Sequence, residues 1–577
     1  MTLRWPWIAA FAVFVACIPL FAWNHHFHND WPNHLGMIGY VGEYLKAHGA
    51  LPATFNTNQI VGRPTPMFYG NLYLPALGAL SALTGPRAAL SLVVVALLFL
   101  QFASVRRLFQ DTTRDEAIAC AAAVIVTWAI YPLTDLYNRS AIPEFVAITA
   151  LQAGSCLWTY YARDPARRGH AGLVAGLLVT VAAGVHPPTA LFGGLTFAVI
   201  WLASLVWCPD RARLLGRSLV IAVAAAGVLA PWLYVVNEFG GQLNIVRSNP
   251  PLSFFPNSLD AIGTRLSVVP TVGPDPTGMG TPNLDPQISV PLGAALFLFA
   301  TVALAVRARD RVARPAFAFA ALCAAATGVL FALSIFAAAW TTLPKSFTII
   351  QFPYRLTAFV NVAALGALTG VLAVLVRAPH HSTWSRLVLA AGVVVASVGV
   401  GLKVPRCLEG GSGADAIVTD YANPPRDWYF GQDDYTTPDA YQKVDTGAPR
   451  QTVTLAVGGA SGFGTVASTH VQVYARTQIV TNVQAFPWNV LTIDGHRVAQ
   501  KATLDDGHRL AAWIEAGEHT VGYEFQPDRA WSALRATSLC FLFLWVCGAA
   551  VGPERARRAV SWALARARRR VSADQSS

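Results

Sequence analysis

The chain has 577 residues, of which 54% are hydrophobic and only 13% are charged. One water-soluble core cannot bury that much apolar surface, so the composition excludes an ordinary soluble protein and indicates a protein of the lipid bilayer. The formal net charge of +11 would suggest a nucleic-acid partner in a soluble protein. Here the arginines fall in short clusters between apolar runs, which is typical of membrane-topology signals.

Residues 5–23 form the first apolar run, which follows a single Arg4 and has no small-residue cleavage site. We therefore expect an uncleaved membrane span rather than a removed signal peptide. Further apolar runs of about 17–25 residues recur along the chain, which is the length that a helix needs to cross the hydrocarbon layer. Most of the eight cysteines lie in such runs. The sequence therefore indicates no disulfide framework, and no Cys/His spacing of metal type occurs.

Arginine clusters alternate with connections that contain almost no basic residues, so the positive-inside rule predicts both topology and orientation. Twelve spans with both termini in the cytoplasm satisfy it. The expected spans are residues 5–23, 87–108, 115–135, 140–161, 170–186, 188–207, 213–236, 288–307, 315–340, 353–376, 386–403 and 533–551. The apolar stretch 71–84 would be a thirteenth span and would place the basic tail on the wrong side. We interpret it as a short re-entrant or interfacial helix.

Long segments on the non-cytoplasmic side divide the chain further. Residues 24–86 and 238–287 are outer loops of a transmembrane domain that spans 1–403, and the second loop, rich in Pro, Gly and Asn, is expected to order over a ligand. In the third such segment, residues 404–529, the latter part alternates apolar and polar side chains and contains two Asp-Gly turns, which predicts a small β-sandwich. The final helix, 533–551, precedes a basic tail, 552–577, that is either an amphipathic helix on the inner leaflet or a solvated segment.

Polar residues at span ends gather on the non-cytoplasmic side. Because a charge inside the hydrocarbon layer costs roughly 2.5–3.5 kcal/mol on insertion scales, these residues require a common explanation. Asp30 and His34 follow the first span in HNDWPNH. The other residues of the predicted site are Arg139 and Glu144 at the fourth span, His186 in GVHPP, and Tyr354 and Arg355 in IIQFPYR.

Each of these residues has a functional and a structural interpretation. Asp30 is either a general base toward a hydroxyl group, a metal ligand together with a histidine, or a helix N-cap. Arg355 either binds a phosphate or anchors a span at the interface. Arg139 and Glu144 are five positions apart and share no face of an ideal helix, so they pair only if the chain turns near Pro143. His186 either closes a tight hairpin or binds a ligand.

A further candidate segment, GRPTPMFYGNLYLP at residues 62–75, combines Arg63 with Tyr69 and other aromatic side chains. Aromatic faces beside an arginine suit a sugar ring or an isoprenoid phosphate, whereas tyrosine at a membrane interface is also ordinary. No glycine-rich phosphate loop and no GxSxG elbow occurs, and nothing in the sequence suggests nucleic-acid recognition.

In motif order the chain resembles the bacterial YfhO-like and 6-pyruvoyl-tetrahydropterin synthase-related membrane proteins. The residues that carry the resemblance are the outer-loop Asp30, the G-x-P-x-x-x-Y stretch, NRSAIPEF, HPP, QFPYR and the segment QAFPWNVLTIDGHRV. Such proteins are similar to the GT-C glycosyltransferases. The resemblance therefore implies a polytopic α-helical fold of GT-C type with a carboxy-terminal periplasmic β-sandwich.

The resemblance also implies an activity, namely transfer of a sugar from a polyprenyl-phosphate-linked donor to a glycan, lipid or protein acceptor on the periplasmic side of the bacterial inner membrane. It implies Asp30 as the base, assisted by His34, and Arg63, Arg139 and Arg355 as ligands of the donor phosphate. GT-C enzymes carry an acidic pair where this chain has a single Asp30, so we assign no metal. The alternatives are a transporter or flippase for lipid-linked sugars and a non-enzymatic glycan-assembly protein.

Overall fold

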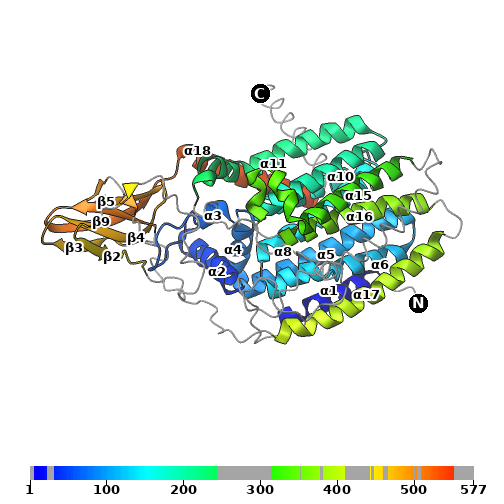
Figure 1. Ribbon diagram of the computed structural model, residues 1–577, viewed down its shortest axis with the longest axis horizontal. Coiled ribbons are helices and arrows are strands. Elements are labelled where there is room, and N and C mark those ends of the chain that lie inside the picture. Colours follow the sequence, from blue (N-terminus) through cyan, green and yellow to red (C-terminus); the bar gives the residue numbers. More distant parts are fainter. Residues whose placement is uncertain are drawn as a thin grey trace, which may run out of the picture.

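The computed structural model describes residues 5–21, 31–69, 71–243, 314–350, 353–376, 381–409, 442–443, 447–458, 466–498, 501–502 and 508–551. These residues form an elongated bundle of helices with a β domain at one end of it (Figure 1). The helices of the bundle are α1 (Trp5–Phe21), α5 (Pro86–Thr113), α6 (Glu116–Thr127), α8 (Ile142–Ala162), α9 (Gly169–Val185), α10 (Gly194–Trp207), α11 (Arg211–Phe239), α15 (Arg314–Ile335), α16 (Leu356–Leu375), α17 (His381–Glu409) and α18 (Arg529–Val551).

Other elements connect these helices or cover one end of the bundle. They are α2 (Trp31–His48), α3 (Thr65–Phe68), α4 (Tyr73–Thr84), α7 (Ile130–Leu133), the π-helical turns η1 (Thr134–Asn138) and η2 (Thr189–Gly193), and the 3-10 turns η3 (Gly240–Gln242), η4 (Ala337–Thr342), η5 (Lys345–Ile350) and η6 (Pro353–Arg355). Among the described residues, eight helical runs are long and apolar enough to cross a membrane. The chain is therefore a multi-pass membrane protein.

The structure agrees with the expected spans where it describes them. The eight runs fall on expected spans, and α1, α8 and α9 account for residues 5–23, 140–161 and 170–186. The expected span 288–307 lies outside the described residues, so the total of twelve stays a prediction. Some boundaries differ: α15 ends at Ile335, before the expected end at 340, and α17 continues to Glu409, beyond the expected end at 403, and buries Lys403.

Helix α4 corresponds to the apolar stretch 71–84. It has 12 residues, which is about 18 Å of helix and less than the hydrocarbon thickness. It ends at Gly85, whose φ of 83° is favourable only for glycine, and α5 begins directly afterwards with Pro86 at its first turn. The sequence Gly85-Pro86 thus separates a short outer helix from a true span.

The arginine-rich connections meet at one end of the bundle. Asp111, near the end of α5, pairs with Arg163 and Arg168 of the α8–α9 connection, each at 2.6 Å. Arg386 of α17 pairs with Asp115 at 2.7 Å, and the same aspartate caps α6. Loops that the positive-inside rule assigned to one side of the membrane therefore contact one another.

The β domain lies at the other end, because α11 starts at the arginine-rich end and its last residue, Phe239, packs on Trp488 of the domain with ring centroids 5.3 Å apart. Two sheets, in the strand orders β1-β7-β8-β4-β2 and β3-β9-β5-β6, share one apolar core. The strands are β1 (Gln442–Lys443), β2 (Arg450–Val453), β3 (Thr469–Val473), β4 (Thr477–Gln484), β5 (Asn489–Ile493), β6 (His496–Arg497), β7 (Lys501–Ala502), β8 (Arg509–Ile514) and β9 (Gly517–Phe525).

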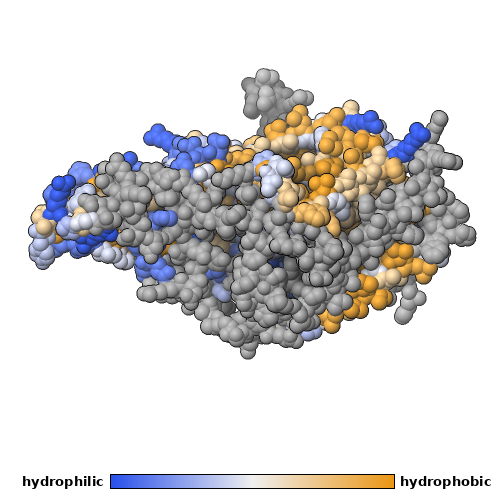
Figure 2. Space-filling view, viewed as in Figure 1, coloured by the Kyte–Doolittle hydropathy of each residue, from blue (hydrophilic) through white to orange (hydrophobic). Residues whose placement is uncertain are grey.

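The turn between β5 and β6 illustrates why the domain folds as expected. Asp494 and Gly495 have φ angles of 54° and 78°, as a two-residue hairpin turn with both central residues left-handed requires. The other expected turn, at Asp506-Gly507, lies outside the described residues. Where the face shown in Figure 2 contains described residues, hydrophobic ones predominate over the helices and hydrophilic ones over the β domain, as expected for a bundle that faces lipid.

Candidate functional site

A buried cluster of charged residues lies at the β-domain end of the bundle, where the chain passes from α7 into α8. The π-helical turn η1 ends just before Arg139, and Ser140 then adopts a φ of 54°. This local break turns the chain back on itself, so that Arg139 lies 3.2 Å from Glu144 in the first turn of α8. Arg139 and Glu144, five positions apart, therefore form an ion pair because the helix is interrupted between them.

Glu144 is the centre of the cluster. Its carboxylate accepts a hydrogen bond from the Tyr131 hydroxyl at 2.7 Å and pairs with both Arg139 and Arg355, the latter at 3.3 Å. Arg139 also pairs with Asp135, one helical turn earlier. Two guanidinium groups and two carboxylates thus balance in charge, and Glu144 and Asp135 are at most 3% exposed. Buried charges are tolerated when they are paired in this way.

Residues from three distant parts of the sequence build this cluster. Arg355 is the N-cap of α16, and the ring of its neighbour Tyr354 lies 5.2 Å from the Arg139 guanidinium carbon. Tyr131 and Asp135 were not among the residues expected from the sequence. Asp135 had a detectable signal, because it lies four residues before Arg139 within an otherwise apolar stretch, the spacing of a helical ion pair.

His186 lies beside this cluster. It caps the end of α9, and its Nδ1 is 2.9 Å from the Thr189 hydroxyl, so it helps to close the connection to α10. It is buried and close enough to Glu144 and Arg355 to interact with both electrostatically. His186 therefore lies both in the connection between α9 and α10 and beside the polar cluster.

His34 extends the cluster toward the outer helices. Its Nδ1 is 2.9 Å from the Tyr73 hydroxyl, and its ring stacks on Tyr69 with centroids 6.3 Å apart. Burial, reinforced by the nearby His186, lowers the pKa of His34 from 6.5 to about 3, so the imidazole is neutral at physiological pH. A neutral imidazole can accept a proton or orient a hydroxyl group. Asp30, the expected base, lies outside the described residues.

Arg63 occupies the junction between the bundle and the β domain. Its backbone pairs with Phe55, while the carbonyl of the preceding Gly62 accepts a hydrogen bond from Asn489 of β5 at 2.8 Å. Gly62 has a φ of 76°, and a Cβ atom there would lie 2.6 Å from the Asn489 amide, so this close approach requires glycine. Arg63 is buried at this junction.

Two polar side chains form a pair in the interior of the spans. Gln101 of α5 donates a hydrogen bond to Gln152 of α8, and both side chains are buried near the middles of their helices. Such a pair links two helices in a medium that offers no water. Among the described residues, no group of three or more His, Cys, Asp or Glu side chains is arranged to hold a metal ion.

The fold and site together define a multi-pass membrane protein with a buried arginine–carboxylate cluster next to an outer β domain. No family model and no curated protein sequence matches the chain. Two solved structures of oligosaccharyltransferases from Archaeoglobus fulgidus are similar. One is AglB in complex with an inhibitory peptide and a dolichol-phosphate, with 12% identity, a TM-score of 0.38, and coverage of 71% of this chain and 56% of that one.

The other is an oligosaccharyltransferase in the apo form, with 14% identity, a TM-score of 0.36, and coverage of 72% of this chain and 57% of that one. The chain thus matches just over half of the length of these proteins. Similarity of this degree does not establish a shared fold, and the resemblance to the YfhO-like family stays a prediction.

Proposed function

We propose that the chain is a membrane glycosyltransferase, which moves a sugar from a polyprenyl-phosphate-linked donor to an acceptor hydroxyl on the periplasmic side of the bacterial inner membrane. The observation that supports this proposal is the cluster of Arg139, Glu144 and Arg355 at the β-domain end of the bundle. A departing lipid phosphate requires fixed cationic groups at the depth where lipid head groups lie, and this cluster supplies them.

Within the cluster we assign the donor phosphate to Arg355. This residue begins α16, and the N-terminus of a helix carries a partial positive charge that favours anions. Arg139 lies between Asp135 and Glu144, which neutralise it, so its role is to position Glu144. Glu144 in turn orients both guanidinium groups.

In the proposed reaction the bond between the sugar C1 and the phosphate oxygen breaks, and its electron pair goes to the phosphate, next to Arg355. The acceptor oxygen forms the new bond to C1 and gives its proton to Asp30. Asp30 directly precedes Trp31, the first residue of α2, in the chain, and α2 also carries His34. We assign His34 and the adjacent Tyr69 and Tyr73 to the orientation of the acceptor or the sugar ring.

A transporter of lipid-linked sugars is the second candidate, favoured by the buried Gln101–Gln152 pair, since transporters place polar groups near the bilayer midplane. The two proposals differ in one measurable respect. A glycosyltransferase transfers sugar in detergent solution, where no membrane separates two compartments, whereas transport requires a sealed vesicle.

The test uses the purified full chain and undecaprenyl phosphate carrying radiolabelled glucose, galactose, mannose or arabinose in turn, with solubilised bacterial envelope as acceptor. We expect Asp30→Asn to lower transfer by about 10²-fold or more, as for loss of a general base. Arg355→Gln should lower transfer by about 10²–10³-fold, as for loss of a charged group that stabilises the transition state.

The matched control is Arg386→Gln, which removes an arginine at the opposite end of the bundle and should keep wild-type transfer. Undiminished transfer by Asp30→Asn would eliminate the base assignment. No transfer by the wild-type chain in detergent, combined with loss of sugar flux into sealed vesicles in Arg355→Gln, would replace the glycosyltransferase with the transporter.

A further inference from the structure

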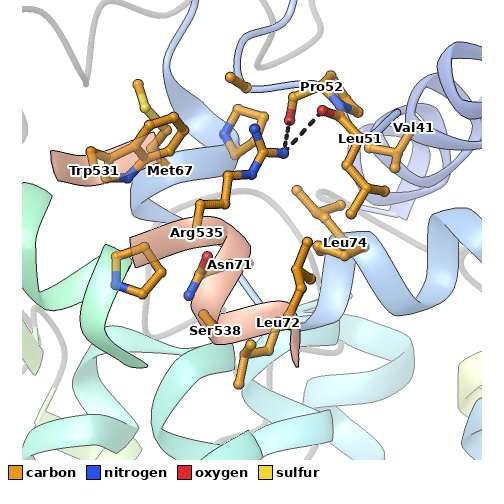
Figure 3. A pocket seen from close by; sticks show the side chains of 15 residues that line it. Val41, Leu51, Pro52, Met67, Asn71, Leu72, Leu74, Trp531, Arg535 and Ser538 are labelled. Atoms are coloured by element: carbon orange, nitrogen blue, oxygen red, sulfur yellow. Dashed lines mark hydrogen bonds between the residues drawn. The ribbon is translucent and has the colours of Figure 1, made fainter. Parts of the chain in front are cut away.

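A second polar feature lies apart from the charged cluster, in a cleft between α18, α11 and the outer helices α2 and α4 (Figure 3). Its walls are mainly apolar and include Val41, Leu72, Leu74 and Leu539. The cleft contains about 560 Å³ of empty space, including its open mouth. Only about 40 Å³ of this space is enclosed, so a ligand would lie along the open mouth of the cleft.

Arg535 points into the cleft from α18 (Figure 3). Its Nη2 donates hydrogen bonds to the carbonyl oxygens of Leu51 and Pro52, at 3.0 and 3.1 Å, and its guanidinium group lies 5.3 Å from the Trp531 ring centroid. These partners are neutral. Within the described part of the chain, no carboxylate forms an ion pair with Arg535. The cleft therefore contains a positive charge that no acidic side chain balances there.

Asn71 provides a second donor. Its side chain lines the same cleft, and its Nδ2 is buried without a hydrogen-bond partner among the described residues. A buried amide donor without a partner is unfavourable, so a ligand that accepts a hydrogen bond from it gains affinity. An arginine charge and an amide donor in one cleft match an anion with several acceptor oxygens, such as a phosphate diester.

The position of the cleft favours a lipid as the source of that phosphate. Helix α18 leaves the β domain at Arg529, so Arg535 lies about 9 Å along the helix from its start, near the expected head-group level. Beyond it, Leu539 and Phe543 are exposed on the outer surface of the bundle, at 43% and 68%. The cleft thus begins with a charged group at the membrane surface and continues along side chains that face hydrocarbon.

We propose that this cleft binds one glycerophospholipid of the surrounding bilayer, with its phosphate on Arg535 and Asn71 and one acyl chain along Leu72, Leu74 and Leu539. The lipid would pack against wall residues whose neighbours contact the candidate site. Leu72 packs directly on Gly184, where a Cβ atom would lie 2.5 Å from the leucine, and Gly184 is two residues before His186. Tyr73, between the two wall leucines, holds His34.

The test measures lipid retention by native mass spectrometry of the purified full chain, so it is independent of any sugar-transfer activity. The protein is incubated with phosphatidylglycerol or with digalactosyl diacylglycerol, which has similar chains but no phosphate. We expect the wild type to retain one phosphatidylglycerol and Arg535→Gln to retain at least fivefold less. The galactolipid should not bind to either protein.

Two further variants separate binding from folding. Arg529→Gln removes an exposed arginine from the start of the same helix and should retain lipid as the wild type does. Leu539→Trp fills the cleft while leaving Arg535 in place, and it should lose the lipid while remaining monodisperse. Equal retention by wild type, Arg535→Gln and Leu539→Trp would overturn the proposal. Displacement of phosphatidylglycerol by an equimolar amount of undecaprenyl phosphate would overturn the assignment to a glycerophospholipid.

Discussion

At the scale of single residues, Glu144 determines the arrangement of the candidate site. One carboxylate holds two guanidinium groups and a tyrosine hydroxyl, all in surroundings that exclude water. Removing one member of a buried ion pair leaves an uncompensated charge, and this costs much more than the pair itself contributes. The site is therefore expected to be intolerant of change at Glu144 for reasons of stability as well as function.

We expect Glu144→Gln to destabilise the protein by about 3–5 kcal/mol, because Arg139 and Arg355 would lose their shared carboxylate. Thermal unfolding of the detergent-solubilised protein, followed by size-exclusion chromatography, measures the change. Glu43→Gln is the control, since the exposed Glu43–Lys46 pair contributes about 0–1 kcal/mol. Unfolding temperatures that are equal in the two variants would contradict the proposed arrangement.

His34 should make the stability of the protein depend on pH. In the unfolded chain the imidazole binds a proton below pH 6.5, whereas burial keeps it neutral in the folded protein down to about pH 3. Stability is therefore full above pH 6.5 and is lost as the pH falls. The loss at pH 5 is about 2 kcal/mol.

Unfolding temperatures at pH 7.5 and pH 5 measure this effect. His34→Asn should show a smaller decrease between the two pH values than the wild type. His48→Asn, at an exposed histidine of the same helix, should decrease as the wild type does. An unchanged decrease in His34→Asn would assign the pH dependence to another group.

Sequence reasoning predicted which residues gather at one end of the bundle but not how they pair. Charge alternation between spans placed Arg139, Glu144, His186 and Arg355 on one side, and the structure brings them together. Sequence reasoning did not predict that Ser140 adopts a left-handed conformation and interrupts the helix, since serine has no strong preference for that conformation. The contacts of Glu144 depend on this single backbone angle.

At the scale of elements, the outer helices are held by close backbone approach. Gly78 of α4 faces Val41 of α2, and a Cβ atom at Gly78 would lie 2.2 Å from Val41 Cγ1. Small residues at such contacts allow helices to pack closely in membrane proteins. This contact fixes α4, whose first residue, Tyr73, holds His34.

We expect Gly78→Ala to destabilise the protein by about 1–3 kcal/mol, because Val41 must move to admit the methyl group. Gly216→Ala is the matched control, since a Cβ atom there would meet no atom within 4 Å and alanine favours the helix. The comparison of unfolding temperatures tests the contact. Equal effects of the two substitutions would show that α2 and α4 are not packed this closely.

Patterns within one element were the most predictable part of the fold. Gly85-Pro86 separated α4 from α5, and Asp494-Gly495 formed the expected hairpin turn, because both effects arise from the backbone of adjacent residues. The Gln101–Gln152 hydrogen bond could not be predicted in the same way. It joins residues 51 positions apart, and their contact depends on the rotation of two helices about their axes.

At the scale of the whole molecule, the arginine-rich connections and the candidate site lie at opposite ends of the bundle. Arginines at one end tie connections together through Asp111, while the candidate site and the β domain occupy the other end. The proposed orientation places the arginine-rich end in the cytoplasm. The structure places the arginine-rich connections and the β domain at opposite ends of the bundle. A labelling experiment can measure which end faces the cytoplasm.

We expect a cysteine at Tyr474, which is 90% exposed on the β domain, to react with a membrane-impermeant maleimide in cells whose outer membrane alone is permeabilised. A cysteine at Arg167, whose side chain is 89% exposed in the α8–α9 connection, should react only after the inner membrane is disrupted. A background without the native cysteines is required, because Cys540 and Cys547 are exposed. Reaction of both positions at the same stage would contradict the proposed topology.

Helix α18 has a consequence for how the molecule is made. Its Ser538 and Trp545 donate hydrogen bonds to the carbonyl oxygens of Val228 and Leu173, residues that precede them by 310 and 372 positions. During synthesis, α9 and α11 therefore remain in the membrane with an open flank until α18 leaves the ribosome. When synthesis stops before Arg529, the surface of α9 and α11 that α18 would cover stays exposed. Such truncated products should therefore be preferred substrates for membrane quality-control proteases.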